Sequence, residues 1–170
     1  NGDIYPGKYE GWYCTPCESF FMEGEGENNL CPDCKRPLER ISEENYFLKL
    51  SKYQDWLIEH IKANPDFIKP VSRYNEVLSF VVNNKLGDLC ISRPRSRLSW
   101  GIDMPFSKEH VVYVWFDALI NYISAIGYSS DEEKFNKYWP ADMQLIGKDI
   151  IRHHAVYWPI MLKSLGLKPP

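Results

Sequence analysis

Four of the five cysteines in this chain form two closely spaced pairs, and their spacing constrains the fold more than any other feature. Two residues separate Cys14 from Cys17, two separate Cys31 from Cys34, and 13 residues lie between the pairs. Two intervening residues let both thiolates of a pair reach one ion from a single turn. Four thiolates complete a tetrahedron and leave no open position for water or substrate. The spacing therefore predicts a structural Zn²⁺ site, within a zinc knuckle over residues 12–40.

Cysteine pairs also occur as disulfides, as redox dithiols and as ligands of iron–sulfur clusters. Residues 1–6 show no signal-peptide pattern, so we expect metal binding in a reducing cytoplasm rather than disulfides. The fifth cysteine, Cys90, stands in an apolar stretch and is expected to be a small buried side chain.

The loop between the cysteine pairs is acidic. It contains Glu18, Glu23, Glu25 and Glu27 and no lysine or arginine, so it should repel phosphate. A basic group follows the second pair at Lys35, Arg36 and Arg40, and it could contact a nucleic-acid backbone. Solvated surface charge is the preferred interpretation of this group.

The net charge limits the classes of partner. With 170 residues and a formal charge of −3, the chain has room for one domain or two small ones and has no overall basic field. We therefore expect no DNA partner, and RNA contacts only through local patches. No run approaches the roughly 18 apolar residues of a membrane helix, so no membrane contact is expected.

The first half of the chain is predicted to form short strands followed by helices. Aromatic and apolar residues predict strands at 9–13, 38–41 and 46–50, with a loop or short hairpin over 18–30. Ser51 is expected to cap a helix that Pro65 ends, and a second helix is expected over 73–82. We interpret residues 1–98 as an insert that contains the knuckle.

The second half alternates between strands and helices. Buried strands are expected at 88–91, 111–116 and 143–146, of which 111–116 should be a parallel strand covered on both faces. Helices are expected at 117–126, 131–138 and 149–165. This order is typical of βαβ units, so the fold class is α/β, with 99–170 forming part of a doubly wound Rossmann-like domain.

Residues at the end of the strand at 111–116 and just beyond it are candidates to line a pocket, because ligands of open α/β sheets bind beyond the carboxyl ends of strands. They are Trp115, Asp117, Ala118 and Tyr122. The competing interpretation is that Trp115 and Tyr122 belong to the core.

The strand expected at 143–146 leads through Gly147 into a helix. A glycine permits close approach of a ligand, a helix N-terminus attracts anions, and Lys148 adds positive charge. Asp149 could cap the helix or accept hydrogen bonds from ribose hydroxyls. Further along, Ile150, His154 and Trp158 recur every four residues on one face, which suits a pocket wall.

These segments together resemble the methionyl-tRNA synthetase family, class I aminoacyl-tRNA synthetases of the bacterial kind. The motifs at 113–118 (YVWFDA) and 146–150 (IGKDI), with His154 and the pair Trp158-Pro159, are similar to those of the methionine enzymes. Residues 9–14 (YEGWYC), the knuckle and 44–47 (ENYF) resemble the connective-peptide insert of that family. Residues 88–94 (DLCISRP) and 100–102 (WGI) are also similar to valyl-, isoleucyl- and leucyl-tRNA synthetases.

The resemblance implies an activity for the whole enzyme. Family members activate methionine with ATP, which is used with Mg²⁺, and transfer the methionyl group to tRNA(Met). The resemblance assigns adenosine binding to Gly147, Lys148 and Asp149. It assigns the methionine pocket to Trp115, Ala118, Tyr122, Ile150, His154 and Trp158.

Two motifs of the class are absent from these residues, His-x-Gly-His and Lys-Met-Ser-Lys-Ser. In this class they stabilise the ATP phosphates in the transition state. We therefore expect a piece of a longer enzyme that contains no catalytic residue and is inactive alone. Two alternatives remain: a stand-alone zinc-ribbon module that binds nucleic acid or protein, and a sister synthetase for valine, isoleucine or leucine.

Overall fold

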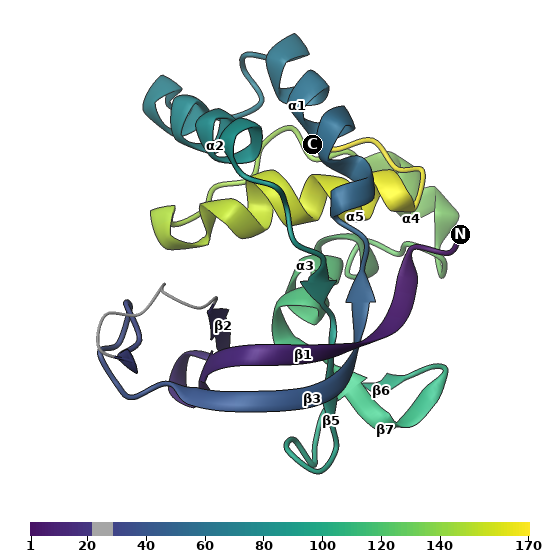
Figure 1. Cartoon of the computed structure of the whole chain (residues 1–170). Coiled ribbons are helices and arrows are strands. Elements are labelled where there is room, and N and C mark those ends of the chain that lie inside the picture. Colours follow the sequence, from purple (N-terminus) through teal and green to yellow (C-terminus); the bar gives the residue numbers. More distant parts are fainter. Residues whose placement is uncertain (22–28) are drawn as a thin grey trace.

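The computed structural model describes residues 1–21 and 29–170. An antiparallel sheet with the strand order β2-β1-β3-β4 forms one side of the molecule (Figure 1). Its strands are β1 (Ile4–Cys14), β2 (Ser19–Phe21), β3 (Glu39–Leu48) and β4 (Leu89–Cys90). A second antiparallel sheet has the order β5-β7-β6. Its strands are β5 (Ser92–Pro94), β6 (Asp103–Met104) and β7 (Ser107–Val112).

The long antiparallel pair of β1 and β3 contains three of the strands that the sequence predicts. The strand predicted at 9–13 lies in β1, and those predicted at 38–41 and 46–50 both fall largely in β3. Its register runs from Ile4↔Leu48 to Tyr13↔Glu39. The polar stretch at 42–45 was expected to separate two strands, but it continues the pairing with β1. Asn45, only 2% exposed, fits there because its side-chain carbonyl accepts a hydrogen bond from the Ser92 hydroxyl at 3.1 Å.

The hairpin expected over 18–30 is described only in part. β2 pairs with β1 in antiparallel fashion, from Trp12↔Phe21 to Cys14↔Ser19. Three members of the acidic group, Glu23, Glu25 and Glu27, lie outside the described residues.

The two helices expected in the first half are present as α1 (Gln54–Ala63) and α2 (Val71–Asn83). The prediction that Ser51 caps the first helix is wrong. A 3-10 turn, η3 (Ser51–Tyr53), precedes α1, and the amide and hydroxyl of Ser51 both donate to the Asp88 carboxylate, at 3.1 and 2.7 Å. The helix start is therefore held by a residue that is distant in the chain.

The apolar run at 111–116 is not one parallel strand. β7 ends at Val112 and pairs antiparallel with both β5 and β6, and α3 (Val114–Ser124) begins two residues later. A short apolar run does not by its periodicity distinguish a buried strand from the start of a buried helix. Here Val111 is fully buried in the sheet, whereas Leu119 and Ile123 bury one face of α3.

The strand predicted at 143–146 is also absent. The segment has no regular secondary structure, and none of the described strands pairs with its backbone. Its apolar side chains are correspondingly exposed, with Met143 at 69% and Leu145 at 89%. A segment without a hydrogen-bonding neighbour does not form a sheet.

The helices of the C-terminal part follow their predicted positions. α4 (Glu132–Tyr138) is capped by Asp131, whose carboxylate accepts from the Lys134 amide at 3.0 Å. The predicted helix at 149–165 is built from a 3-10 turn, a π-helix and an α-helix. These are η4 (Lys148–Ile150), η5 (His153–Tyr157) and α5 (Trp158–Ser164).

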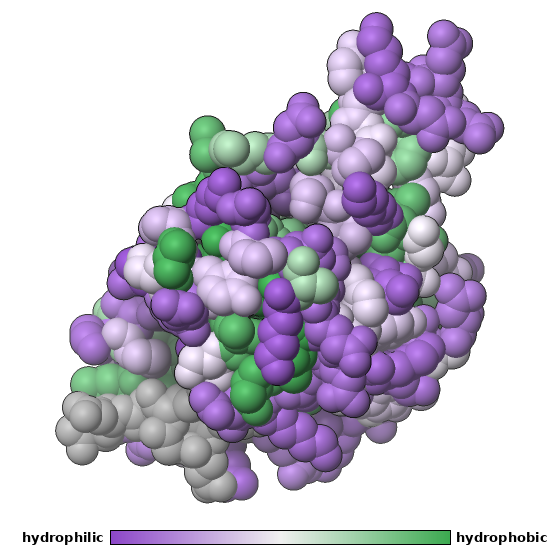
Figure 2. All heavy atoms as spheres, turned by 90° about the horizontal axis from the view of Figure 1, so that it is seen from above, coloured by the Kyte–Doolittle hydropathy of each residue, from purple (hydrophilic) through white to green (hydrophobic). Residues whose placement is uncertain are grey.

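One hydrophobic core joins the two halves of the chain. The helix that ends in α5 lies between the α1–α2 pair and α3 (Figure 1), and it contributes Trp158, Ile160 and Leu162, each at most 1% exposed. The face seen in Figure 2 is mostly hydrophilic, and apolar residues appear on it in several separate places, with the largest group near the lower centre. The fold is mixed α/β, as the sequence predicts. Within residues 1–21 and 29–170, no helix is both long and apolar enough to cross a membrane.

Candidate functional site

The structure brings the four paired cysteines together. Their sulfur atoms all lie within 4.8 Å of one another, with 3.4 Å between Cys14 and Cys34 and 3.9 Å between Cys17 and Cys31. Sulfurs bound to one Zn²⁺ at about 2.3 Å in a tetrahedron would be about 3.8 Å apart. The cluster can therefore hold a metal ion.

Local backbone structure positions these ligands. Cys14 ends β1, and the turn η1 (Thr15–Cys17) brings Cys17 back beside it. On the second arm, the Lys35 amide donates to the Cys31 carbonyl at 2.9 Å. The backbone amide of Arg36 also donates to the Cys34 sulfur and lowers the pKa of that thiol to about 7. Amide donors of this kind favour the thiolate, which is the metal-binding form.

Cys90 lies outside this cluster. It is 5% exposed, as expected for a small core residue, and burial raises the pKa of its thiol.

A buried arginine lies beside the cysteine cluster, and the sequence analysis did not single it out. The guanidinium of Arg93, in β5, lies over three aromatic rings, at 4.9 Å from Tyr13, 4.0 Å from Phe20 and 4.3 Å from Tyr113. Arg93 is 2% exposed. We call this arrangement the Arg93 cage. Its residues come from β1, β2, β5 and the start of α3, so no single sequence motif reveals it.

Glu18 connects the cage to the cysteine cluster. It directly follows Cys17, and its carboxylate accepts a hydrogen bond from the Tyr13 hydroxyl. Its backbone carbonyl accepts from the Tyr113 hydroxyl. Burial raises the pKa of Tyr113, so its phenol stays protonated and remains a donor. Because Tyr113 is the N-cap of α3, the knuckle is tied to the start of that helix.

Three of the six predicted methionine-binding residues lie on α3. Trp115, Ala118 and Tyr122 are spaced by three and four residues and so share one face of the helix. Trp115 is half-buried, Ala118 is exposed and Tyr122 is 38% exposed, so none is fully buried in the core.

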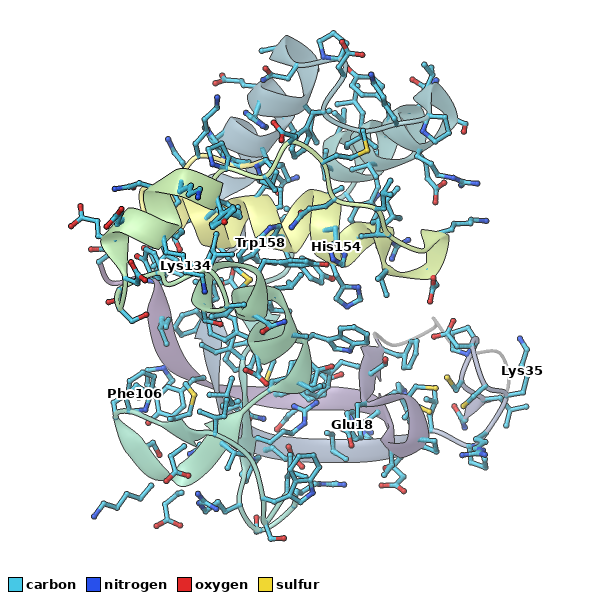
Figure 3. The ribbon with its side chains drawn as sticks, turned by 180° about the vertical axis from the view of Figure 1, so that it is seen from behind. Glu18, Lys35, Phe106, Lys134, His154 and Trp158 are labelled. Atoms are coloured by element: carbon cyan, nitrogen blue, oxygen red, sulfur yellow. The ribbon has the colours of Figure 1, made fainter. Side chains whose placement is uncertain are left out.

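The other three lie on the helix that faces α3, where His154 pairs with Tyr122. The Nδ1 atom of His154 is 3.0 Å from the carbonyl of Ile150, which can only accept a hydrogen bond. Nδ1 therefore carries the proton, and in the neutral ring Nε2 accepts from the Tyr122 hydroxyl at 2.8 Å. Trp158 lies on the same helix, 5.8 Å from the Tyr122 ring, and is 1% exposed (Figure 3).

His153 is a second residue that the sequence analysis missed. Its ring packs on Trp115, with 4.3 Å between the ring centroids. The adjacent pair His153-His154 was the available signal, but regular helical spacing assigns only one of two neighbours to a given face. The wider π turn lets both rings reach α3.

The three predicted adenosine-binding residues lie at the start of the same helix, and all three are exposed. The Asp149 carboxylate folds over Gly147, because a Cβ at residue 147 would lie 2.5 Å from its Oδ1 atom. A side chain at residue 147 would therefore displace this exposed carboxylate. Asp149 makes no capping bond, so the interpretation of Asp149 as a helix cap is wrong. Lys148 is the neighbouring positive charge.

A hollow of 270 Å³ lies beside this region, between α3 and the exposed segment that carries Met143 and Leu145. Tyr122 is the only predicted site residue that lines it. The hollow therefore touches the Tyr122 end of the α3 face that Trp115, Ala118 and Tyr122 share. Trp115 and Ala118 do not line it.

The chain matches known synthetases. A family model described as "tRNA synthetases class I (M)" covers residues 37–170. The methionine–tRNA ligase of Clostridium acetobutylicum is 58% identical over 171 residues, covering all of this chain and 26% of that protein. The enzyme of Thermotoga maritima is 53% identical over 174 residues, covering all of this chain and 27% of that protein.

Solved structures agree with this assignment. Mycobacterium tuberculosis methionyl-tRNA synthetase bound by methionyl-adenylate superposes with a TM-score of 0.91 at 47% identity. That match covers 99% of this chain and 34% of the other. The chain thus spans about a quarter to a third of the length of these relatives. It belongs to the methionyl (M) family of class I tRNA synthetases.

Proposed function

We propose that this chain forms the methionine side of the active site in a methionine–tRNA ligase. In the whole protein, methionine reacts with ATP to give methionyl-adenylate, and the methionyl group then passes to tRNA(Met). The observation that carries the proposal is the Tyr122–His154 pair beside Ala118, in a chain of the M family. The M. tuberculosis relative is described with methionyl-adenylate bound.

Methionine would lie against the α3 face. A thioether side chain favours apolar and aromatic walls with one or two polar groups at the edge. In this proposal the half-buried Trp115 and Ile150 supply the walls, the core residue Trp158 closes the pocket behind Tyr122, and the exposed methyl of Ala118 leaves room between them. Tyr122 and His154 hold each other through the 2.8 Å hydrogen bond and supply the polar edge.

ATP would lie at the start of the facing helix. Asp149 is a free carboxylate suited to accept hydrogen bonds from ribose hydroxyls. Gly147 has no side chain of its own to obstruct the adenosine, and Lys148 attracts the phosphates, which would arrive with Mg²⁺. We place no catalytic residue in this chain.

The cysteine cluster would hold a structural Zn²⁺. All four ligands would be thiolates, so the ion would cross-link the two arms of the knuckle and offer no open position to substrate. We assign residues 1–98 to an insert and 99–170 to part of the catalytic domain, in a cytoplasmic enzyme. The contact between Glu18 and Tyr113 supports an insert that packs on the active-site helix α3.

ATP–pyrophosphate exchange tests the proposal. The full-length protein should exchange pyrophosphate in a methionine-dependent reaction, whereas the isolated 170-residue chain should show no rate above background, because it lacks the two phosphate-binding motifs. Valine, isoleucine and leucine serve as competing substrates. Preference of the full-length protein for one of these would contradict the proposal, and so would a robust methionine-dependent rate from the isolated chain.

A further inference from the structure

A charged side chain links the start of the helix that ends in α5 to α2. The guanidinium of Arg152 lies over the ring of Phe80, 4.3 Å from the ring centroid. Phe80 is partly buried and packs against the main hydrophobic core, whereas Arg152 is exposed. Figure 1 shows α2 beside this end of the helix. Arg152 therefore connects the part of the chain that we assign to the catalytic domain with the part that we assign to the insert.

The proposed adenosine-binding turn has few other attachments. Gly147, Lys148 and Asp149 are exposed, and no side chain caps the helix start. Residues 143–146, which lead into the turn, pair with none of the described strands. Among the residues that the structure describes, neither Lys148 nor Asp149 has a side-chain hydrogen bond or ion pair. The position of the turn therefore depends mainly on how the residues that follow it are held.

The spacing and the chemistry of Arg152 suit it to hold the turn. It follows Asp149 by three residues and Lys148 by four, so the three side chains lie along the same side of the helix start. A guanidinium stacks on an aromatic face without needing a carboxylate partner, and Arg152 has no ion pair with any described residue. We therefore expect Arg152 to act on the turn through the backbone, by fixing the helix start against α2.

We propose that Arg152 is a positioning residue for ATP, which fixes the turn at 147–149 against α2 by stacking on Phe80. The proposal rests on the proposed function above. The flat face of the guanidinium is what matters, so a tyrosine at this position should replace it although tyrosine carries no charge. A short aliphatic side chain should not replace it. Losing one such contact at an exposed position should weaken ATP binding about two- to fivefold.

The test compares KM values of full-length variants in ATP–pyrophosphate exchange. Arg152→Ala should raise the ATP KM about two- to fivefold and leave the methionine KM unchanged. Arg152→Tyr should keep the wild-type ATP KM. Phe80→Leu retains an apolar side chain but removes the ring, and it should raise the ATP KM to the same extent as Arg152→Ala. Because the two side chains act as one contact, their effects should not add in the double variant.

Lys163 supplies a matched control. Its ammonium lies 5.2 Å from the centroid of the Trp56 ring, so it is also an exposed cation on an aromatic face. This contact, however, joins the far end of the same helix to α1. Lys163→Ala should leave the ATP KM unchanged. An equal rise in that variant would overturn the inference, because loosening the helix at any point would then suffice.

The outcomes separate this inference from the proposed function. An unchanged ATP KM in Arg152→Ala would overturn the inference. So would an Arg152→Tyr variant as impaired as Arg152→Ala, because the charge would then act directly on the ATP phosphates. Additive effects in the double variant, or equal rises in the methionine and ATP KM values, would also overturn it. If the wild-type protein showed no methionine-dependent exchange, the proposed function itself would fail.

Discussion

Metal removal from the full-length protein should unfold the knuckle before any other part of this chain. Among the described residues, the hydrophobic cluster around the cysteines has one further buried side chain, Leu38, with Trp12 and Phe21 partly buried around it. A core of that size is too small to hold the two arms together alone. Metal binding supplies folding free energy in such small sites.

Hydrogen–deuterium exchange measures this effect. After chelation, amides in residues 9–21 and 29–41 should exchange about 100-fold faster, which corresponds to a loss of about 3 kcal/mol in local stability. Amides of α1 and α2 should keep their rates. Cys34→Ser should reproduce the effect of the chelator, whereas Cys90→Ala, which alters a buried cysteine outside the cluster, should not. Unchanged protection of the knuckle after chelation would show that the metal does not stabilise it.

Replacing Arg93 should release the knuckle from α3. The Arg93→Ala substitution removes a buried cation from three aromatic faces and leaves a cavity. Together these losses should lower the local stability of β2 and the first turn of α3 by about 3 kcal/mol. Arg93→Lys should recover little of this loss, because an ammonium group does not stack its plane on rings as a guanidinium does.

Native-state hydrogen exchange in the full-length protein can report this change. Arg40→Ala is the matched control, since Arg40 is exposed on β3, and its effect should stay within about 0.5 kcal/mol. Wild-type exchange rates in Arg93→Ala would mean that the cage does not stabilise this junction. If Arg93→Lys behaved like the wild-type protein, the charge alone would suffice and the ring contacts would be dispensable.

The sequence was most informative where spacing within the chain determines the geometry. The two Cys-x2-Cys turns predict the sulfur cluster because each turn needs only local residues. The periodicity around Trp56, Leu57 and Ile61 predicts α1 for the same reason. The helix expected at 117–126 is present as α3, but the first residues of α3, 114–116, were assigned to a strand.

The predictions that failed and the residues that the sequence analysis missed mostly involve contacts between residues that are distant in the chain. The expected strand at 143–146 fails because pairing requires a neighbouring strand, and none of the described strands lies there. The Arg93 cage is built from residues between positions 13 and 113, so no local sequence pattern predicts it. His153 was missed because regular helical spacing does not anticipate a π turn.

The central claim is that the α3 face around Ala118 binds methionine, and Ala118→Leu tests it most directly. Leucine is a good helix former, so α3 should persist while its side chain fills the space between Trp115 and Tyr122. In the full-length protein the methionine KM should rise about ten- to 100-fold and the ATP KM should stay within about twofold. Ala63→Leu, the same change at an exposed position of α1, should alter neither value. An unchanged methionine KM in Ala118→Leu would contradict the account.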